Sequence, residues 1–212
     1  MSLATVVRRI ARVGNDDRIG MDEFGNLTVS QGLPAYARLA AAGRLYVLDT
    51  HAGTAKAPVV AAPTTSPEWG LYNASPDEVL VVLEAACTLK SGTAGLGLAL
   101  MMASAIGEQT LVSADYTGAI KSCTDGSQRK PDAFITNNPT LVGGTPGWAV
   151  LDATRVNTVA TDSVGDGLVA HPDGKFIARP RGMVALEVVG ETGTTALFSV
   201  SFLVAMLPLD RY

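Results

Sequence analysis

Short runs of apolar and β-branched residues alternate with turn residues along most of this chain of 212 residues. Runs of this length, bounded by glycine, proline, asparagine or aspartate, are typical of antiparallel β-strands. We expect strands at Arg44–Asp49, Trp69–Asn73, Val79–Leu89, Thr110–Ala114, Ala133–Thr136, Trp148–Leu151, Gly167–Ala170, Lys175–Ala178, Met183–Val189 and Ala196–Met206. No long helical pattern interrupts this rhythm, so the residues predict an all-β fold, either a sandwich or a barrel.

The segments beside these strands are less regular. The turn Gly190–Thr194 separates the last two expected strands and predicts that they pair as a hairpin. The run Leu96–Ile106 suits either a strand or a buried helix, and its flanking glycines and neighbouring strands favour a strand. The stretch Gly53–Pro67 contains prolines that cannot donate to a sheet ladder, so we expect an extended loop or edge segment on the surface.

Residues 1–30 differ from the rest of the chain in pattern and charge. Their apolar residues recur at helical spacing, which would place three arginines largely on the opposite side. A short amphipathic helix and an extended arm both fit, and the polar, turn-rich Gly14–Gly20 is expected to be a hinge. We therefore expect an N-terminal arm and hinge over residues 1–30 and a β-sandwich domain over residues 31–212. The candidate interface residues of this arm are Leu3, Val6, Val7, Arg8, Arg9, Ile10, Arg12 and Val13.

The composition excludes some classes of protein. Hydrophobic residues make up 47% of the chain and charged residues only 17%, so disorder of the whole chain is excluded. The formal net charge of −4 argues against binding nucleic acid by net charge, and we expect no specific nucleic-acid partner. The N-terminus lacks the order of a secretory signal, and no apolar run reaches the about 18 residues of a membrane span, so no membrane partner is expected.

Motifs for catalysis and for cofactor binding are weak. The two histidines, His51 and His171, lie beside turn residues and are expected to face solvent, and the chain has no nucleophile-elbow motif. The segment Gly95–Gly97 begins like a dinucleotide fingerprint, but Leu100 stands where glycine or alanine is needed. We therefore expect no catalytic residues and no cofactor.

Metal ligands and disulfides are not indicated either. Cys87 and Cys123 match no metal or redox spacing, and Cys87 is expected to be buried and unbridged within its apolar strand. Oxygen ligands from Asp162 and Asp166 on a glycine-rich turn would suit calcium, but turn capping is the ordinary explanation for such aspartates. No metal site is expected.

Several carboxylates are candidates for a catalytic or interface role. A glycosidase needs two carboxylates that face one cleft, and the sequence does not place Glu68, Asp115 or Glu187 relative to each other. Glu84 and Glu187 lie inside apolar strands, where alternation can direct both toward solvent. The alternative is a subunit contact, in which a buried carboxylate would need a basic partner.

Two stretches of the body resemble small β-rich virion proteins of tailed bacteriophages. The first is Pro63–Asn73 (PTTSPEWGLYN), which is similar to a strand end that leads into a core strand, here Val79–Leu89. The second comprises Phe176–Pro180, Gly182–Val189 and Ala196–Leu207, and it resembles the last hairpin of a jelly roll. The resemblance implies a jelly-roll-like antiparallel β-sandwich that acts in the capsid or on its surface as a symmetric oligomer.

We therefore expect a non-enzymatic virion structural protein that decorates or cements a bacteriophage capsid, or forms a spike base, through subunit contacts. The expected partners are further copies of itself, with a homotrimer favoured, and the major capsid protein or other virion proteins. The expected location is the virion capsid, after assembly in the host cytoplasm.

Two alternatives remain open. One is a virion module that binds a host receptor or a glycan through exposed aromatic residues. Its candidate aromatic residues are Tyr36, Trp69, Tyr116 and Trp148. The other is a hydrolase whose site is assembled from distant residues, with His51 or His171 close to a carboxylate and a serine.

Overall fold

The computed structural model describes residues 19–21, 27–29, 36–50, 55–61, 63–94, 97–110, 116–119, 121–123, 133–155, 167–191 and 195–209. By its internal contacts the chain divides into two units, Met1–Arg38 and Leu39–Tyr212. The short helix α2 (Ala37–Ala41) contains the boundary between them.

The first unit contains a pair of short strands that the sequence did not predict. Strand β1 (Ile19–Met21) pairs antiparallel with β2 (Leu27–Val29), and Gly20 lies opposite Thr28. The expected hinge Gly14–Gly20 therefore ends within a strand. The candidate interface residues of the arm, Leu3 to Val13, lie outside the described residues.

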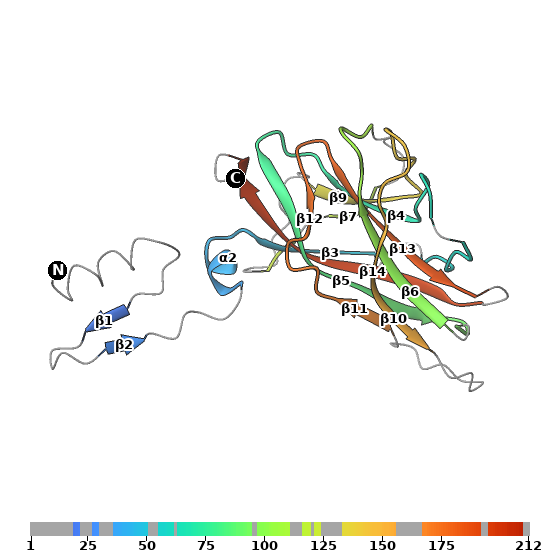
Figure 1. The fold of residues 1–212 in the computed structure, drawn as a ribbon, viewed down its shortest axis with the longest axis horizontal. Coiled ribbons are helices and arrows are strands. Elements are labelled where there is room, and N and C mark those ends of the chain that lie inside the picture. Colours follow the sequence, from blue (N-terminus) through green and yellow to red (C-terminus); the bar gives the residue numbers. More distant parts are fainter. Residues whose placement is uncertain are drawn as a thin grey trace. The chain divides into compact units, whose positions relative to one another are not determined.

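The second unit is built from two β-sheets (Figure 1). The strands of the first sheet (sheet I) are β3 (Leu45–Asp49), β5 (Glu78–Ser91), β8 (Lys121–Ser122), β11 (Gly167–Ala170), β12 (Phe176–Ala178) and β14 (Leu197–Pro208). The strands of the second (sheet II) are β4 (Trp69–Asn73), β6 (Gly97–Ser104), β7 (Tyr116–Ala119), β9 (Ala133–Asn137), β10 (Ala149–Arg155) and β13 (Met183–Gly190). Sheet I has the order β11-β5-β14-β3-β8 with β12 paired to β5, and sheet II has the order β10-β6-β13-β4-β9-β7.

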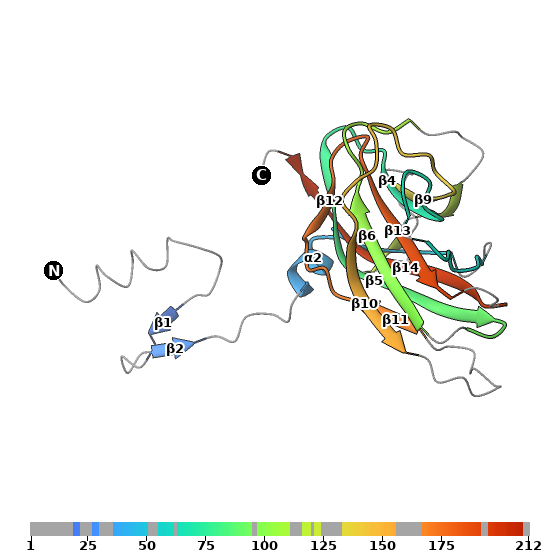
Figure 2. The ribbon, with the colours of Figure 1, turned by 45° about the vertical axis from the view of Figure 1, so that its right-hand side comes forward.

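The pairing of these strands is that of a jelly roll. The chain folds back on itself as one long antiparallel ribbon, in which β3 pairs with β14, β4 with β13, β5 with β11 and β6 with β10. The ribbon is wrapped so that the order β3-β14-β5-β11 forms one layer and β4-β13-β6-β10 the other, as Figure 2 shows. The predicted all-β, jelly-roll-like antiparallel sandwich is therefore confirmed.

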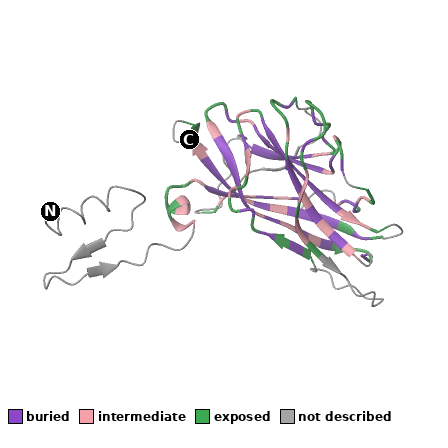
Figure 3. Cartoon of the chain, viewed as in Figure 1, coloured by how far each residue is buried: buried purple, intermediate pink, exposed green. Residues whose placement is uncertain are grey.

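The core lies between the two sheets, where alternate residues of each strand meet (Figure 3). In β13, for example, Val184, Leu186 and Val188 point inward and are fully buried. The largest buried side chains include Trp69 on sheet II and Phe198 on sheet I. Each fully buried side chain of this kind contributes about 1.5–3 kcal/mol, so the alternation seen in the sequence is what stabilises the sandwich.

Most of the expected strands are present, with ends that differ by at most two residues, except that β10 continues four residues past the expected Leu151. The ambiguous run Leu96–Ile106 forms the strand β6, so the choice of strand over helix is confirmed. The expected strand Thr110–Ala114 is not supported, since Thr110 is not in a strand and the remainder lies outside the described residues. Strands β7 and β8 follow this segment and were not predicted.

The predicted hairpin between the last two strands is wrong. Strand β13 belongs to sheet II, between β6 and β4, whereas β14 belongs to sheet I, between β5 and β3. Both edges of each strand are therefore occupied by other partners. The two strands are therefore not neighbours, although few residues separate them along the chain.

The proline-containing stretch follows its prediction in part. It is extended, and Ala57, Val60 and Thr64 are exposed, but Pro58, Pro63 and Pro67 are buried. Lys56 forms an isolated bridge with Phe198 of sheet I, and Val59 forms one with Val189 of sheet II. This connection, which we name the strap (residues 55–68), therefore crosses from one sheet to the other.

Candidate functional site: a buried lysine–carboxylate cluster

Glu187 lies in the interior of the protein, which corrects the prediction that it faces solvent. In β13, Glu187 lies on the same face of the strand as Met183 and Ala185. The core residues Val184 and Leu186 lie on the opposite face. Its exposed fraction is nevertheless 0%. The backbone N–H of Glu68, at the end of the strap, donates to Glu187 Oε2 at 2.8 Å, so the strap covers this position.

The Glu187 carboxylate has backbone donors on both oxygens. The N–H of Glu68 donates to Oε2, and the N–H of Val188 donates to Oε1 at 3.1 Å. Burial raises the pKa of Glu187 to about 7, and the nearby Glu68 charge acts in the same direction. The two N–H donors and the Lys56 charge oppose this rise. Burial therefore prevails over the hydrogen bonds.

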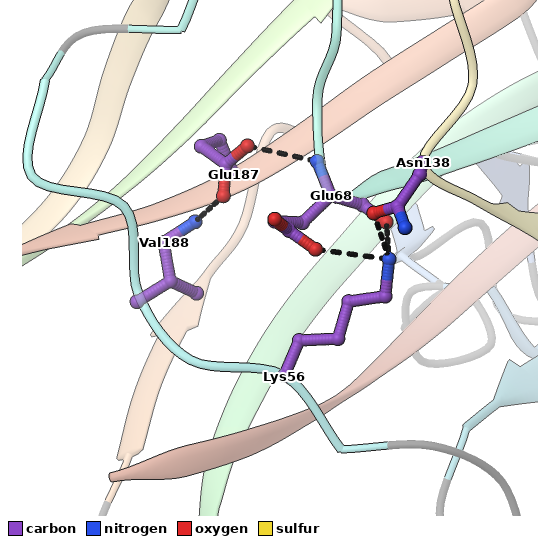
Figure 4. Close-up of polar contacts among 5 residues, drawn as sticks. All are labelled: Lys56, Glu68, Asn138, Glu187 and Val188. Atoms are coloured by element: carbon purple, nitrogen blue, oxygen red, sulfur yellow. Dashed lines mark hydrogen bonds and ion pairs between the residues drawn. The ribbon is translucent and has the colours of Figure 1, made fainter. Parts of the chain in front are cut away.

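Lys56 of the strap is the basic residue of this cluster (Figure 4). Only 9% of its side chain is exposed, and its Nζ donates to the backbone oxygen of Glu68 at 2.8 Å and forms an ion pair with Glu68 Oε2 at 2.9 Å. The Nζ also donates to Oδ1 of Asn138 and lies 6.0 Å from the centre of the Trp69 ring. A buried lysine with this many acceptors is held in one position.

Three separate segments bring these side chains together. Lys56 is fixed by two backbone hydrogen bonds between the strap and Phe198. Glu68 immediately precedes β4, and Asn138 immediately follows β9, the strand paired with β4. The N–H of Asn138 donates to the Glu68 oxygen at 3.0 Å, and Asn138 has a left-handed backbone with φ of 47°. We refer to Lys56, Glu68, Asn138 and Glu187 as the Lys56 cluster.

Glu68 and Glu187 were candidate carboxylates from the sequence, whereas Lys56 and Asn138 were not predicted to be part of a site. Glu68 and Glu187 lie near each other, as the two carboxylates of a glycosidase must. However, Lys56 and the strap occupy the space beside them, where a substrate would have to bind. The cluster places an amine, a carboxylate and a carboxamide in direct contact. This set can transfer protons, and it can join the amine to the carboxamide.

The other charged pair of interest is on the surface. His171 Nδ1 lies 3.4 Å from Glu84 Oε2, and both side chains are well exposed. His171 therefore faces solvent as predicted. In the part of the chain that the structure describes, no serine hydroxyl is hydrogen-bonded to His171. His51, Asp115, Asp162 and Asp166 lie outside that part.

The aromatic residues considered for a binding platform are mostly not exposed. Trp69 is fully buried in the core, which corrects that expectation. Trp148 is half-buried and its Nε1 donates to Thr64 at 3.2 Å, and Tyr36 is half-buried as well. The fourth candidate, Tyr116, begins β7.

The two cysteines are not joined. Cys87 is buried and Cys123 is exposed, and both are free thiols, so the prediction of an unbridged Cys87 is confirmed. Among the described residues, no group of three or more histidine, cysteine, aspartate or glutamate side chains is arranged to hold a metal ion. Within the same residues, no helix is long and apolar enough to cross a membrane.

An exposed apolar pair lies at the loops that follow β6 and β9. Ile106 and Val142, which we name the apolar tip, are each 50% exposed. The buried Gln109 side chain binds both loops: Nε2 donates to the oxygens of Ile106 and Val142 at 2.9 and 3.0 Å, and Oε1 accepts the N–H of Val142 at 2.8 Å. Gly143 has φ of 93°, and a Cβ there would meet the Ile106 oxygen at 2.7 Å, so the two loops are closely packed.

No protein-family model matches the chain, and no curated protein matches its sequence.

Proposed function

We propose that this chain is a non-enzymatic structural protein of a bacteriophage virion, which decorates or cements the capsid through subunit contacts. The jelly roll occurs in viral capsid and lectin domains, which supports the proposal at the level of the fold. Because one fold serves many functions, a surface feature has to carry the argument. That feature is the apolar tip.

The apolar tip has the properties of a contact surface. Its two side chains expose apolar area that would contribute about 25 cal/mol for each Å² removed from water on binding. The Gln109 hydrogen bonds hold both loops in place before any partner arrives. Binding to a fixed surface costs less conformational entropy than binding to a mobile one, so the tip is suited to a permanent contact.

The proposed partners are further copies of the chain and the major capsid protein or another virion protein. A closed cyclic oligomer, for which we favour a trimer, buries a repeated apolar patch without open-ended growth. The proposed location is the virion capsid. The N-terminal arm, whose sequence carries an apolar stripe together with Arg8, Arg9 and Arg12, would supply a second contact.

A substitution at the apolar tip tests the proposal. The double variant Ile106→Ser, Val142→Ser should bind capsids assembled without this protein at least tenfold more weakly than the unaltered chain, as measured by co-sedimentation over a concentration series. The matched control is Val169→Ser on β11, where a valine is 51% exposed outside the tip. Equal binding by the double variant and the control would contradict the role of the tip, and failure of the unaltered chain to bind capsids would contradict the function.

A further inference from the structure

The amine of the buried Lys56 and the side-chain amide of the exposed Asn138 are in direct contact (Figure 4). We propose that these two side chains condense to form an intramolecular amide cross-link between the strap and the end of β9. The inference rests on the geometry of the Lys56 cluster and does not depend on the proposed function.

The geometry favours reaction between these two groups over any other pair. Lys56 is buried, and two backbone hydrogen bonds to Phe198 fix its position in the chain. Asn138 is fixed by its own N–H, which donates to the Glu68 oxygen at 3.0 Å. The same Glu68 oxygen accepts from Lys56 Nζ at 2.8 Å, so one carbonyl aligns both reacting residues. Because the fold already holds the two groups side by side, the reaction does not have to overcome the entropy cost of bringing them together.

A catalytic carboxylate is also in place. Glu68 Oε2 lies 2.9 Å from Lys56 Nζ, within the distance at which a general base can take a proton. The centre of the Trp69 ring lies 6.0 Å from the same amine. Glu68 therefore touches a reacting atom and is the catalytic residue of the proposed step.

The reaction balances without an oxidant or a reductant. Glu68 takes a proton from Nζ, and the free electron pair of Nζ attacks Cγ of Asn138, which forms a C–N bond. Glu68 then gives this proton to Nδ2 of Asn138, the Cγ–Nδ2 bond breaks, and its electron pair leaves with ammonia. Glu68 takes a second proton from Nζ, which leaves the new amide neutral and Glu68 protonated. The products are a secondary amide between the two side chains and one molecule of ammonia.

The cross-link would close a loop from residue 56 to residue 138. Closing a long loop restricts the unfolded chain, as a disulfide does, and so raises resistance to denaturation. Unlike a disulfide, an amide would persist in reducing conditions.

Intact-mass spectrometry of the denatured full chain tests the proposal. The unaltered protein should be lighter than its sequence by one ammonia, and a tryptic digest should contain a branched peptide that joins Lys56 to Asn138. Lys56→Arg and Asn138→Ala should show the full sequence mass. Lys175→Arg, at an exposed lysine, is the control and should keep the loss. Circular dichroism checks that each variant is folded.

Two further variants test the chemistry. Glu68→Gln should remain unlinked or link at least tenfold more slowly after synthesis, and a normally linked Glu68→Gln chain would overturn the role of Glu68. Asn138→Asp should release water instead of ammonia and reach the same final mass as the linked unaltered protein. The proposal as a whole is overturned if the unaltered protein has the full sequence mass and trypsin cleaves after Lys56, a result that needs no variant.

Discussion

Glu187 on β13 accepts the backbone N–H of Glu68 at 2.8 Å, so a buried carboxylate holds the residue that immediately precedes the neighbouring strand β4. This hydrogen bond continues the β13–β4 pairing one residue past Trp69, where the backbone ladder ends. The strap is thereby attached to sheet II through a group whose charge depends on pH.

The first prediction concerns that charge. Burial raises the pKa of Glu187 from its ordinary 4.5 to about 7, so between these values the folded protein holds more protons than the unfolded chain. The free energy of unfolding should therefore fall as pH rises through this interval, by roughly 3 kcal/mol at most. Glu187→Gln should reduce this slope in urea denaturation, and Glu191→Gln, just beyond the same strand, should leave it unchanged. A slope in Glu187→Gln equal to that of the unaltered protein would contradict the prediction.

The second prediction concerns the end of β3. The buried Thr50 hydroxyl accepts the N–H of Val200 at 2.9 Å. Thr50→Val keeps the shape but leaves this N–H unsatisfied, so it should lower the free energy of unfolding by about 1–3 kcal/mol. Thr50→Ser retains the hydroxyl and should cost less than the valine variant in guanidinium denaturation. If serine costs as much as valine, the hydrogen bond is not what stabilises this position.

The third prediction concerns the hydrogen bonds of Gln109 that hold the two loops of the apolar tip. Gln109→Met fills a similar volume but removes the acceptor of the Val142 N–H. The Val142 amide should exchange its hydrogen faster, by at least tenfold, in exchange measured by nuclear magnetic resonance. Glu108→Gln, at an exposed neighbour, should leave this amide protected. Unchanged protection in Gln109→Met would mean that another contact holds the loop.

The fourth prediction concerns the two thiols. Burial raises the pKa of Cys87 to about 11, and its side chain is shielded, so it should not react with a thiol reagent in the folded protein. Cys123 is exposed and should react, slowed by the smaller rise in its pKa that partial burial causes. Titration should count one reactive thiol before denaturation and two after it. A Cys123→Ser variant that still reacts when folded would contradict the burial of Cys87.

The fifth prediction concerns the arm. Deleting residues 2–13 should leave a folded body and weaken assembly on capsids, because the apolar stripe needs a surface on which to dock. Replacing only Arg8, Arg9 and Arg12 should weaken assembly less, and mainly at low salt, since exposed ion pairs contribute up to about 1 kcal/mol each and are screened by salt. If the truncated chain assembles as well as the full chain, the arm has no anchoring role.

The strands and their inward faces could be predicted because alternation is a local property of the sequence. The pairing of the strands could not. The turn Gly190–Thr194 has the residues of a hairpin, yet β13 and β14 lie in different sheets. Each is held between two partners that are distant in sequence, and those four pairings outweigh one local turn.

The Lys56 cluster could not be predicted from the sequence, because it too depends on contacts between distant segments. Alternation places Glu187 on the outer side of β13, and this direction was predicted, but the strap that covers it comes from a distant segment. One signal was present in the sequence: Lys56 is the only charged residue in the segment 52–67. A single charge among small apolar residues and prolines suggests that the charge has a partner within the protein.

The chain enters the body beside the place where it leaves, since the N–H of Met206 donates to the oxygen of Arg44 at 3.1 Å. Strands β3 and β14 run antiparallel from this point, so a mechanical load applied to the two ends would peel them apart one pair at a time instead of shearing all pairs together. Rupture would start at Leu45 and Ala205 and travel toward Thr50. Among the residues that the structure describes, the next attachment along the chain is Lys56, where a covalent bond would arrest the rupture.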